Sequence, residues 1–184
     1  MANADTEVTL PQMQAAISAA IAAAFPDFRT VEFDRDDEDE NLPLPACLLE
    51  FVEAEPAPSN DAGTGQWPAL ARFEARVLLN ARKTARADVK VVAVAVAAWL
   101  NLRRFPGVFV DPCQVIACEP DEFAPSLDKF RAWRIEWVVP AMFGNSAWAC
   151  NGGASQSFFS FAPYIGADHE DSYSPIEGPL DVQP

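Results

Sequence analysis

The sequence contains one histidine and lacks the short motifs that mark most catalytic, metal and phosphate sites. His169 stands in a Pro/Gly-rich tail, where a surface position is the simplest interpretation. The four cysteines have no CxxC spacing and are predicted to be core thiols, and a zinc site would need three of them from separate segments. Gly63-Thr-Gly65 and Gly152-Gly153 lack the strand-to-helix setting that brings a backbone against phosphates. We therefore predict no catalytic residue, no metal ligand and no cofactor.

Long apolar runs and positive charge are also scarce. No apolar stretch approaches the ~20 residues that a membrane-spanning helix needs, and the first residues lack the basic region of a signal peptide. We expect a soluble protein that is made in the cytoplasm and does not bind membranes. Lys and Arg number 13 against 27 Asp and Glu, which gives a net charge of −14. Such a chain is not expected to wrap nucleic acid, because phosphate binding needs basic clusters.

The few positive charges are concentrated in one part of the chain. Between Arg72 and Arg104 there are 8 bases and 2 acids, whereas residues 1–71 carry 14 acids and 2 bases, and the residues after Phe143 carry 5 acids and no base. In a monomer this segregation gives only an uneven solvated surface. In a ring of identical subunits, a basic face would meet the acidic face of a neighbour, and such complementarity sets register and association rate more than affinity.

The hydrophobic pattern predicts an α+β domain in which two helices pack on a mostly antiparallel sheet of about four strands, in the order α-β-β-α-β-β. The first helix starts at Leu10, where Thr9 and Gln12 can form a capping box, and it stops at Phe25-Pro26. Its apolar stripe consists of Leu10, Met13, Ile17 and Ile21. Alternation and short apolar runs predict the strands at 46–53, 72–80, 114–119 and 130–139. In the last of these, one face is predicted to carry Trp133, Ile135, Trp137 and Val139.

A second helix is predicted from Ala85 to Arg104. Alternating valines and alanines within it are also typical of a strand, but the length, the alanine content and the stop at Phe105-Pro-Gly107 favour a helix. One side carries an apolar stripe, and the opposite side, which includes Val91 and Val94, is apolar too. A helix that is apolar nearly all round must be covered on more than one side. We expect the sheet to cover one side, and a neighbouring subunit or the chain's own tail to cover the other.

Two long loops interrupt this pattern. Residues 34–40 hold six carboxylates in seven positions, which repel one another and favour an exposed loop. This run has neither the central glycine nor the ligand spacing of an EF-hand, so no calcium site is predicted. Residues 54–70 are too many for a plain hairpin turn, and they carry Trp67.

The chain after the last predicted strand has a different character. Residues 1–143 are assigned to the α+β domain, and 144–184 to an irregular C-terminal extension. Phe158 and Phe159 belong to a stretch of this extension that is too apolar for a purely disordered tail. We expect the extension to dock on its own domain or on a neighbouring subunit.

The order of these elements resembles that of the tail terminator proteins (minor tail proteins) of long-tailed bacteriophages. The resemblance covers about Leu10 to Phe143. Two stretches accompany it, Arg72-Phe-Glu-Ala-Arg-Val-Leu-Leu-Asn80 before the apolar helix and Arg131-Ala-Trp-Arg-Ile-Glu-Trp137 in the last strand. The acidic loop and the C-terminal extension exceed the minimal two-helix, four-strand module of that family.

This resemblance implies a structural virion protein that forms a ring, commonly six-fold, at the head-proximal end of the tail. There it would stop growth of the tail tube and present a surface for head joining. The implied partners are copies of the same chain, the tail-tube protein and head–tail connector proteins, while DNA passes through the lumen without sequence-specific binding. An acidic lumen would repel that DNA, and the loop 34–40 is a candidate for its lining.

The residues expected at subunit or partner interfaces combine the basic band, the apolar helix and the aromatic loops: Trp67, Arg72, Arg76, Arg82, Lys83, Val91, Val94, Phe158 and Phe159. The nearest alternative function is a head–tail connector or neck protein. A small cytosolic hydrolase that uses His169 with a thiol or hydroxyl is a further alternative, because catalytic partners meet in space and not in sequence. A third is a monomeric module that binds a basic peptide through the acidic loop.

Overall fold

The computed structural model describes residues 8–35, 42–83, 85–121, 130–144, 146, 158–161, 163, 165 and 167–175. The chain divides into two units, one formed by Thr6–Ala147 and the other by Met1–Asp5 with Trp148–Pro184. The predicted acidic loop falls mostly on residues 36–40, which lie outside the described residues.

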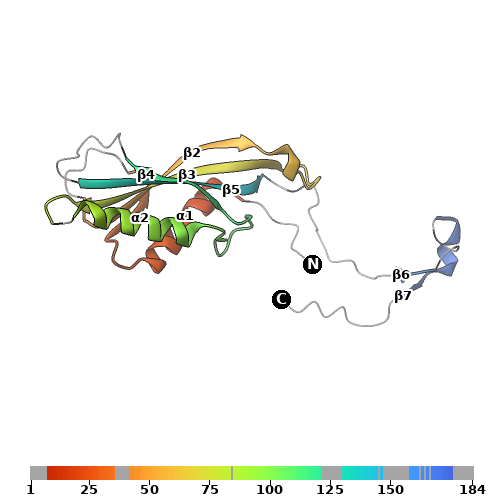
Figure 1. Cartoon of the computed structure of the whole chain (residues 1–184). Coiled ribbons are helices and arrows are strands. Elements are labelled where there is room, and N and C mark those ends of the chain that lie inside the picture. Colours follow the sequence, from red (N-terminus) through yellow and green to blue (C-terminus); the bar gives the residue numbers. More distant parts are fainter. Residues whose placement is uncertain are drawn as a thin grey trace. The chain divides into compact units, whose positions relative to one another are not determined.

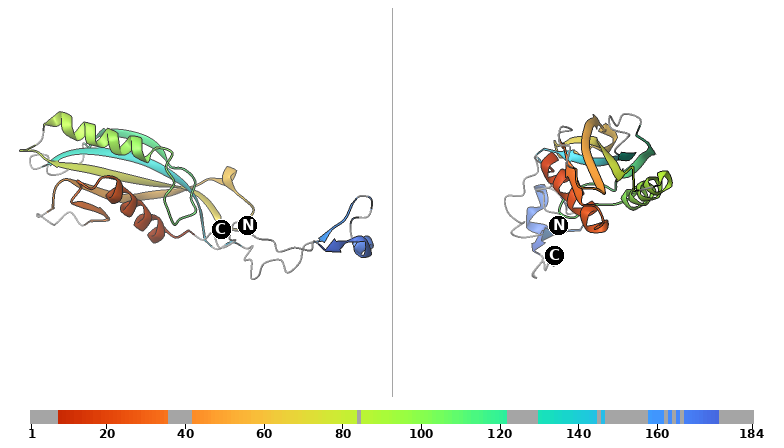
Figure 2. Two further views of the ribbon diagram at one scale, coloured as in Figure 1. Left: turned by 90° about the horizontal axis from the view of Figure 1, so that it is seen from below. Right: turned by 90° about the vertical axis from the view of Figure 1, so that its left-hand side faces the viewer.

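The described residues of the larger unit form two helices and a five-stranded sheet (Figure 1). In chain order its elements are α1 (Leu10–Ala24), β1 (Thr30–Phe33), β2 (Ala46–Pro56), the 3-10 turn η1 (Pro58–Asn60), β3 (Trp67–Asn80), α2 (Arg86–Leu100), β4 (Gln114–Pro120) and β5 (Phe130–Phe143). The strand order across the sheet is β1-β2-β3-β5-β4. Both helices lie on one face of the sheet (Figures 1 and 2), which confirms the predicted α+β class.

The sheet has one strand more than the four predicted from sequence. β1 is only four residues long and pairs parallel to β2, whereas the other pairings are antiparallel. Thr30 lies opposite Ala46 and Phe33 opposite Leu49. So short a run has no periodicity of its own, and β2 stabilises it as a strand only after the chain has folded back.

Helix α1 begins where the sequence predicts. The Thr9 amide donates to Oε1 of Gln12 at 2.9 Å, and the Gln12 amide donates to Oγ1 of Thr9 at 3.4 Å, which completes the capping box. Three side chains of the predicted stripe, Met13, Ile17 and Ile21, are fully buried against the sheet. The helix therefore contributes one side to the core.

Helix α2 is shorter than predicted and ends at Leu100, not at Arg104. The Asn101 amide still donates to the carbonyl of Ala97, but Leu102 has a φ of 61°, and its amide donates to the carbonyl of Cys113, the residue before β4, at 2.8 Å. This contact with a distant residue turns the chain away from the helix axis. The apolar pattern continues past Leu100 and gives no sign of the turn.

The core between helices and sheet is centred on β3 and β5, which pair along 14 residues each. Phe73 of β3 and Trp137 of β5 are fully buried and stack with ring centroids 5.8 Å apart. The predicted alternation of β5 is confirmed, because Ile135, Trp137 and Val139 are buried on the helix side. Large aromatic side chains at the sheet centre supply much of the apolar burial that stabilises the unit.

The smaller unit has little regular structure among its described residues. The short strands β6 (Phe158–Phe159) and β7 (Ser174–Pro175) pair antiparallel, and the 3-10 segment η2 (Ala167–Ser172) lies between them in sequence. Phe161 and Ile165 are exposed in this unit.

Candidate interaction surfaces

The face of the sheet that points away from the helices is here called the outer sheet face. It carries a network of ion pairs. Three arginines are each bonded to two or more carboxylates, and the whole network contains seven carboxylates: Glu50, Glu53, Glu55, Glu74, Glu119, Asp121 and Glu136. The three arginines are Arg72, Arg76 and Arg134. Seven acids around three bases leave this face with an excess of four negative charges.

Arg72 and Arg76, predicted as interface residues, lie in this network. Nη1 of Arg72 donates to Oε1 of Glu136 at 2.7 Å, and Nη1 of Arg76 donates to Oε2 of Glu50 at 2.7 Å. Donation to Glu136 raises the pKa of Arg72, and donation to Glu119 raises the pKa of Arg134. Each guanidinium is thus already paired within its own subunit, so this face as a whole presents negative charge to a partner.

Helix α2 presents a second surface with the opposite character. Its inner side is buried, with Val89, Val96 and Leu100 packed on the sheet. Its outer side carries Val91, which is 69% exposed, and Val94, which is 56% exposed. Ala95 and Ala98 are exposed as well, and positions 91, 94, 95 and 98 fall on one side of a helix. We call these four residues the outer stripe of α2. An apolar stripe facing solvent is unusual for a helix of a monomeric domain.

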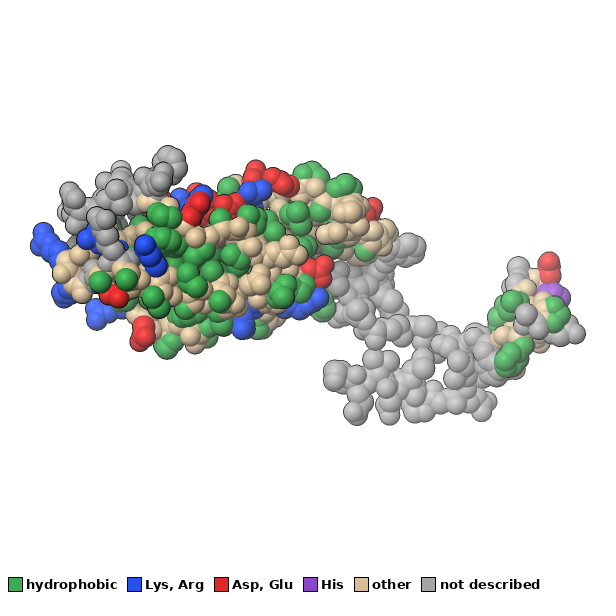
Figure 3. Space-filling view, viewed as in Figure 1, with side chains coloured by type: hydrophobic (Ala, Val, Ile, Leu, Met, Phe, Trp, Pro, Cys, Tyr) green, Lys and Arg blue, Asp and Glu red, His purple; other side chains and the backbone are tan. Residues whose placement is uncertain are grey.

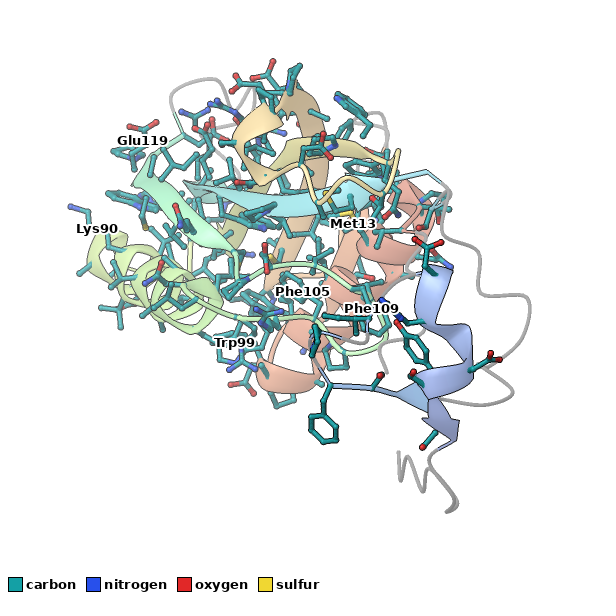
Figure 4. The ribbon with its side chains drawn as sticks, turned by 90° about the vertical axis from the view of Figure 1, so that its right-hand side faces the viewer. Met13, Lys90, Trp99, Phe105, Phe109 and Glu119 are labelled. Atoms are coloured by element: carbon teal, nitrogen blue, oxygen red, sulfur yellow. The ribbon has the colours of Figure 1, made fainter. Side chains whose placement is uncertain are left out.

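Cations border this stripe. Nζ of Lys90 lies 5.4 Å from the ring centroid of Trp133, and the Arg103 guanidinium lies 4.0 Å from that of Trp99, both in cation–π range. Arg82 and Lys83 are exposed in the turn that precedes α2. In Figure 3, Lys and Arg gather at that end of the unit, whereas Asp and Glu gather over β2. Figure 4 likewise shows Lys90 in the helix layer and Glu119 in the sheet layer.

Trp67 lies at the beginning of β3, five residues before Arg72 of the ion-pair network. It is 47% exposed and packs on Phe143 of β5, with ring centroids 5.8 Å apart. Beside it, Nε2 of the buried Gln66 donates to the carbonyl of Gly144 at 2.8 Å. One part of the Trp67 side chain therefore packs on its own pair of strands, and the rest is accessible to a partner.

A pocket of about 560 Å³ opens between three segments of the larger unit. We call it the loop pocket. The loop before β3, the loop after α2 and the end of β5 supply its lining: Asn60, Ala62, Thr64, Gln66, Arg104, Phe105, Val108, Phe109, Val110, Asp111, Pro140, Ala141 and Met142. Phe105 is buried and Phe109 is 63% exposed, and both belong to the loop that follows α2 (Figure 4).

This pocket has no counterpart among the sequence predictions, in which Phe105-Pro-Gly107 marks only the stop of a helix and the loop before β3 is only a connection. The pocket forms because the Asp111 amide donates to the carbonyl of Pro140 at 3.0 Å and holds the loop against β5. The available signal was the clustering of Val108, Phe109 and Val110 directly after a turn, where polar residues are more usual.

In the part of the chain that the structure describes, the groups predicted for the alternative hydrolase function, His169 and a thiol, fall in different units. His169 lies on η2 in the smaller unit and is exposed. Burial raises the pKa of the Cys47 thiol to about 12, so this sulfur stays protonated at neutral pH. Sγ of Cys113 donates to the carbonyl of Leu100 at 2.7 Å and is buried. Among the described residues, no cluster of three or more His, Cys, Asp or Glu side chains has the arrangement of a metal site.

The predicted interface residues fall into separate groups. The structure brings Arg72 and Arg76 together on the outer sheet face, and Val91 and Val94 together on α2, on opposite sides of the larger unit. Arg82 and Lys83 border the α2 side. Phe158 and Phe159 form β6 in the smaller unit, and their side chains lie outside the described set. Within the described residues, no helix has the length and apolar character needed to cross a membrane.

No protein-family model and no curated protein matches the chain. A solved structure titled "Virion of native gene transfer agent (GTA) particle" contains a similar chain, with 16% identity over 72% of this chain and 96% of that chain and a TM-score of 0.46. A second solved structure, described only by a sequence identifier, has 12% identity over 74% of this chain and 94% of its own, with a TM-score of 0.44. Likeness at this level carries no argument about function.

Proposed function

We propose that this protein is a structural subunit of a phage-like virion, a tail terminator that forms a ring with copies of itself. The observation that carries the proposal is the outer stripe of α2, where two valines are more than half exposed on a helix whose other side is already buried. Such a stripe is stabilised when a second protein surface covers it. The element order resembles that of tail terminators, and this resemblance suggests that the assembly is a ring at the end of a tail.

The two opposite surfaces of the larger unit suit a head-to-tail ring. A ring requires two different patches that complement each other, because each subunit contacts its neighbours through unlike faces. The α2 side is apolar and bordered by Lys90 and Arg103, while the outer sheet face has an excess of carboxylates and two exposed apolar side chains nearby, Val52 and Ile116. We infer that α2 of one subunit packs toward the sheet of the next, and that the opposite charges set the register.

The position in the virion follows from the same resemblance. A ring at the head-proximal end of the tail would contact the tail-tube protein on one side and head–tail connector proteins on the other. We further propose that the ring is six-fold, that it ends the growth of the tail tube and that it joins the head to the tail. DNA would pass through the ring without specific contacts, and a net charge of −14 favours its passage over adsorption.

The test is an assembly measurement with a matched control. Light scattering and electron microscopy of the purified chain, alone and with tail-tube subunits, should yield a ring or a tube capped at one end. The double variant V91D/V94D should lose assembly because two buried carboxylates would lack partners. The control A15D/A19D introduces the same charges at exposed positions of α1 and should assemble normally. A wild-type chain that stays monomeric in both settings would reject the proposal.

A further inference from the structure

We propose that the loop pocket binds the C-terminal segment around Phe161 from a second copy of this chain. The inference rests on the proposed ring, because a ring brings the extension of one subunit close to the pocket of another. It adds a contact that α2 and the outer sheet face do not supply. The extension would thereby link neighbouring subunits.

The pocket has the chemistry of a site for an aromatic side chain. Its apolar walls include Phe105, Val110 and Ala141, which are 3%, 5% and 6% exposed. The volume of about 560 Å³ falls in the range of roughly 300–1,000 Å³ that is usual for ligand sites, so a few side chains fit. Phe109 is 63% exposed at its edge and offers a ring for offset or edge-to-face packing.

Polar groups at the pocket suit a peptide rather than a purely apolar ligand. Nη1 of Arg104 donates to the carbonyl of Val110 at 3.1 Å, which fixes the guanidinium beside the cavity, where it can face an incoming aromatic ring. Oγ1 of Thr64 is buried and has no hydrogen-bond partner among the described residues. A buried hydroxyl without a partner is costly, and a peptide amide or carbonyl entering the pocket would supply one.

The C-terminal extension supplies a suitable occupant. In the smaller unit, Phe161 is 76% exposed and Ile165 is 56% exposed. Two large apolar side chains this open to solvent, a few residues apart, gain free energy when another surface covers them. The guanidinium of Arg104 is already paired with Asp111 of the same lining, with Nη2 3.3 Å from Oδ1, so apolar contacts and not charge would hold this segment.

The path of the chain favours a second copy as the source of this segment. The extension leaves the larger unit at the pocket, since the carbonyl of Gly144 accepts a hydrogen bond from Gln66, one of the lining residues. Thirteen residues, 145–157, then precede Phe158, and fully extended they reach at most about 50 Å. The segment would need a much shorter linker to reach the pocket of its own subunit, which lies beside the point where the extension leaves the larger unit. The linker is therefore long enough to reach a neighbouring subunit.

Disulfide crosslinking between differently labelled chains tests this contact. One chain carries A62C at the exposed edge of the pocket, and the other carries S160C next to Phe161, so both proposed partners of the contact stay intact. Under mild oxidation the mixture should give a dimer of twice 20.0 kDa that neither variant gives alone. Adding F161S to the S160C chain should slow its formation by about tenfold or more, as expected for a buried aromatic side chain, while the exposed control D171A should not.

The outcomes separate this inference from the ring itself. A ring seen by light scattering without any A62C–S160C dimer would overturn the inference and leave the proposed function standing. A single chain carrying both substitutions that closes on itself as a monomer, with no dimer in the mixture, would show that the segment binds its own pocket and would also overturn it. Dimers that form equally fast with and without F161S would indicate random collisions and count against it as well.

Discussion

Replacing the two outer valines of α2 by alanine should stabilise the isolated subunit. Val91 and Val94 are 69% and 56% exposed, so in a monomer their methyl groups contribute little burial, and valine is a poorer helix former than alanine by about 0.5 kcal/mol. The double variant V91A/V94A should therefore raise the free energy of unfolding by about 1 kcal/mol. With a urea m-value of about 2 kcal/mol/M, the midpoint moves up by about 0.5 M.

The matched comparison is V96A on the opposite side of the same helix. Val96 is fully buried, and removing its two methyl groups costs about 2 kcal/mol after the gain in helix propensity, so the midpoint falls by about 1 M. Both variants are measured by circular dichroism at a protein concentration where the chain is monomeric. V91A/V94A should also weaken ring assembly, because the valine methyl groups that are exposed in the monomer are buried in the proposed ring. A lower midpoint for V91A/V94A would refute the reasoning, since it would mean that these valines are packed within one subunit.

Further predictions concern the start of α1, the sheet centre and a buried thiol. T9A removes the side chain of the capping box and should lower the free energy of unfolding by about 1 kcal/mol, whereas T9S should restore most of it in the same denaturant titration. W137A should lower the free energy of unfolding by about 3–5 kcal/mol. W137F should lower it much less, because the indole Nε1 that it removes is buried without a hydrogen-bond partner among the described residues. Burial raises the pKa of Cys47 to about 12, so the folded state holds this proton more tightly than the unfolded state does. Stability from this group is complete below the unfolded pKa and is lost as pH rises toward 12, and C47A should flatten that alkaline decline when unfolding is measured from pH 8 to 11.

Sequence patterns determined the parts of this protein whose signals are local. The capping box at Thr9, the buried stripe of α1 and the alternation of Ile135, Trp137 and Val139 were predicted and are present, because each depends on residues within one or two turns or along one strand. The excess of apolar residues on α2 was visible for the same reason. A periodic pattern indicates which residues share one side of a helix or strand. That side becomes buried when another element packs against it.

Tertiary structure decided the remaining features. Strand β1 exists because β2 lies beside it, and α2 stops at Leu100 because Leu102 bonds to Cys113. The loop pocket joins three segments that are distant in sequence. These features depend on contacts between residues far apart along the chain, and only folding brings such residues together. The sequence alone determined which side chains are apolar or charged, and the fold decided that the outer stripe of α2 and the carboxylates of the outer sheet face point in opposite directions.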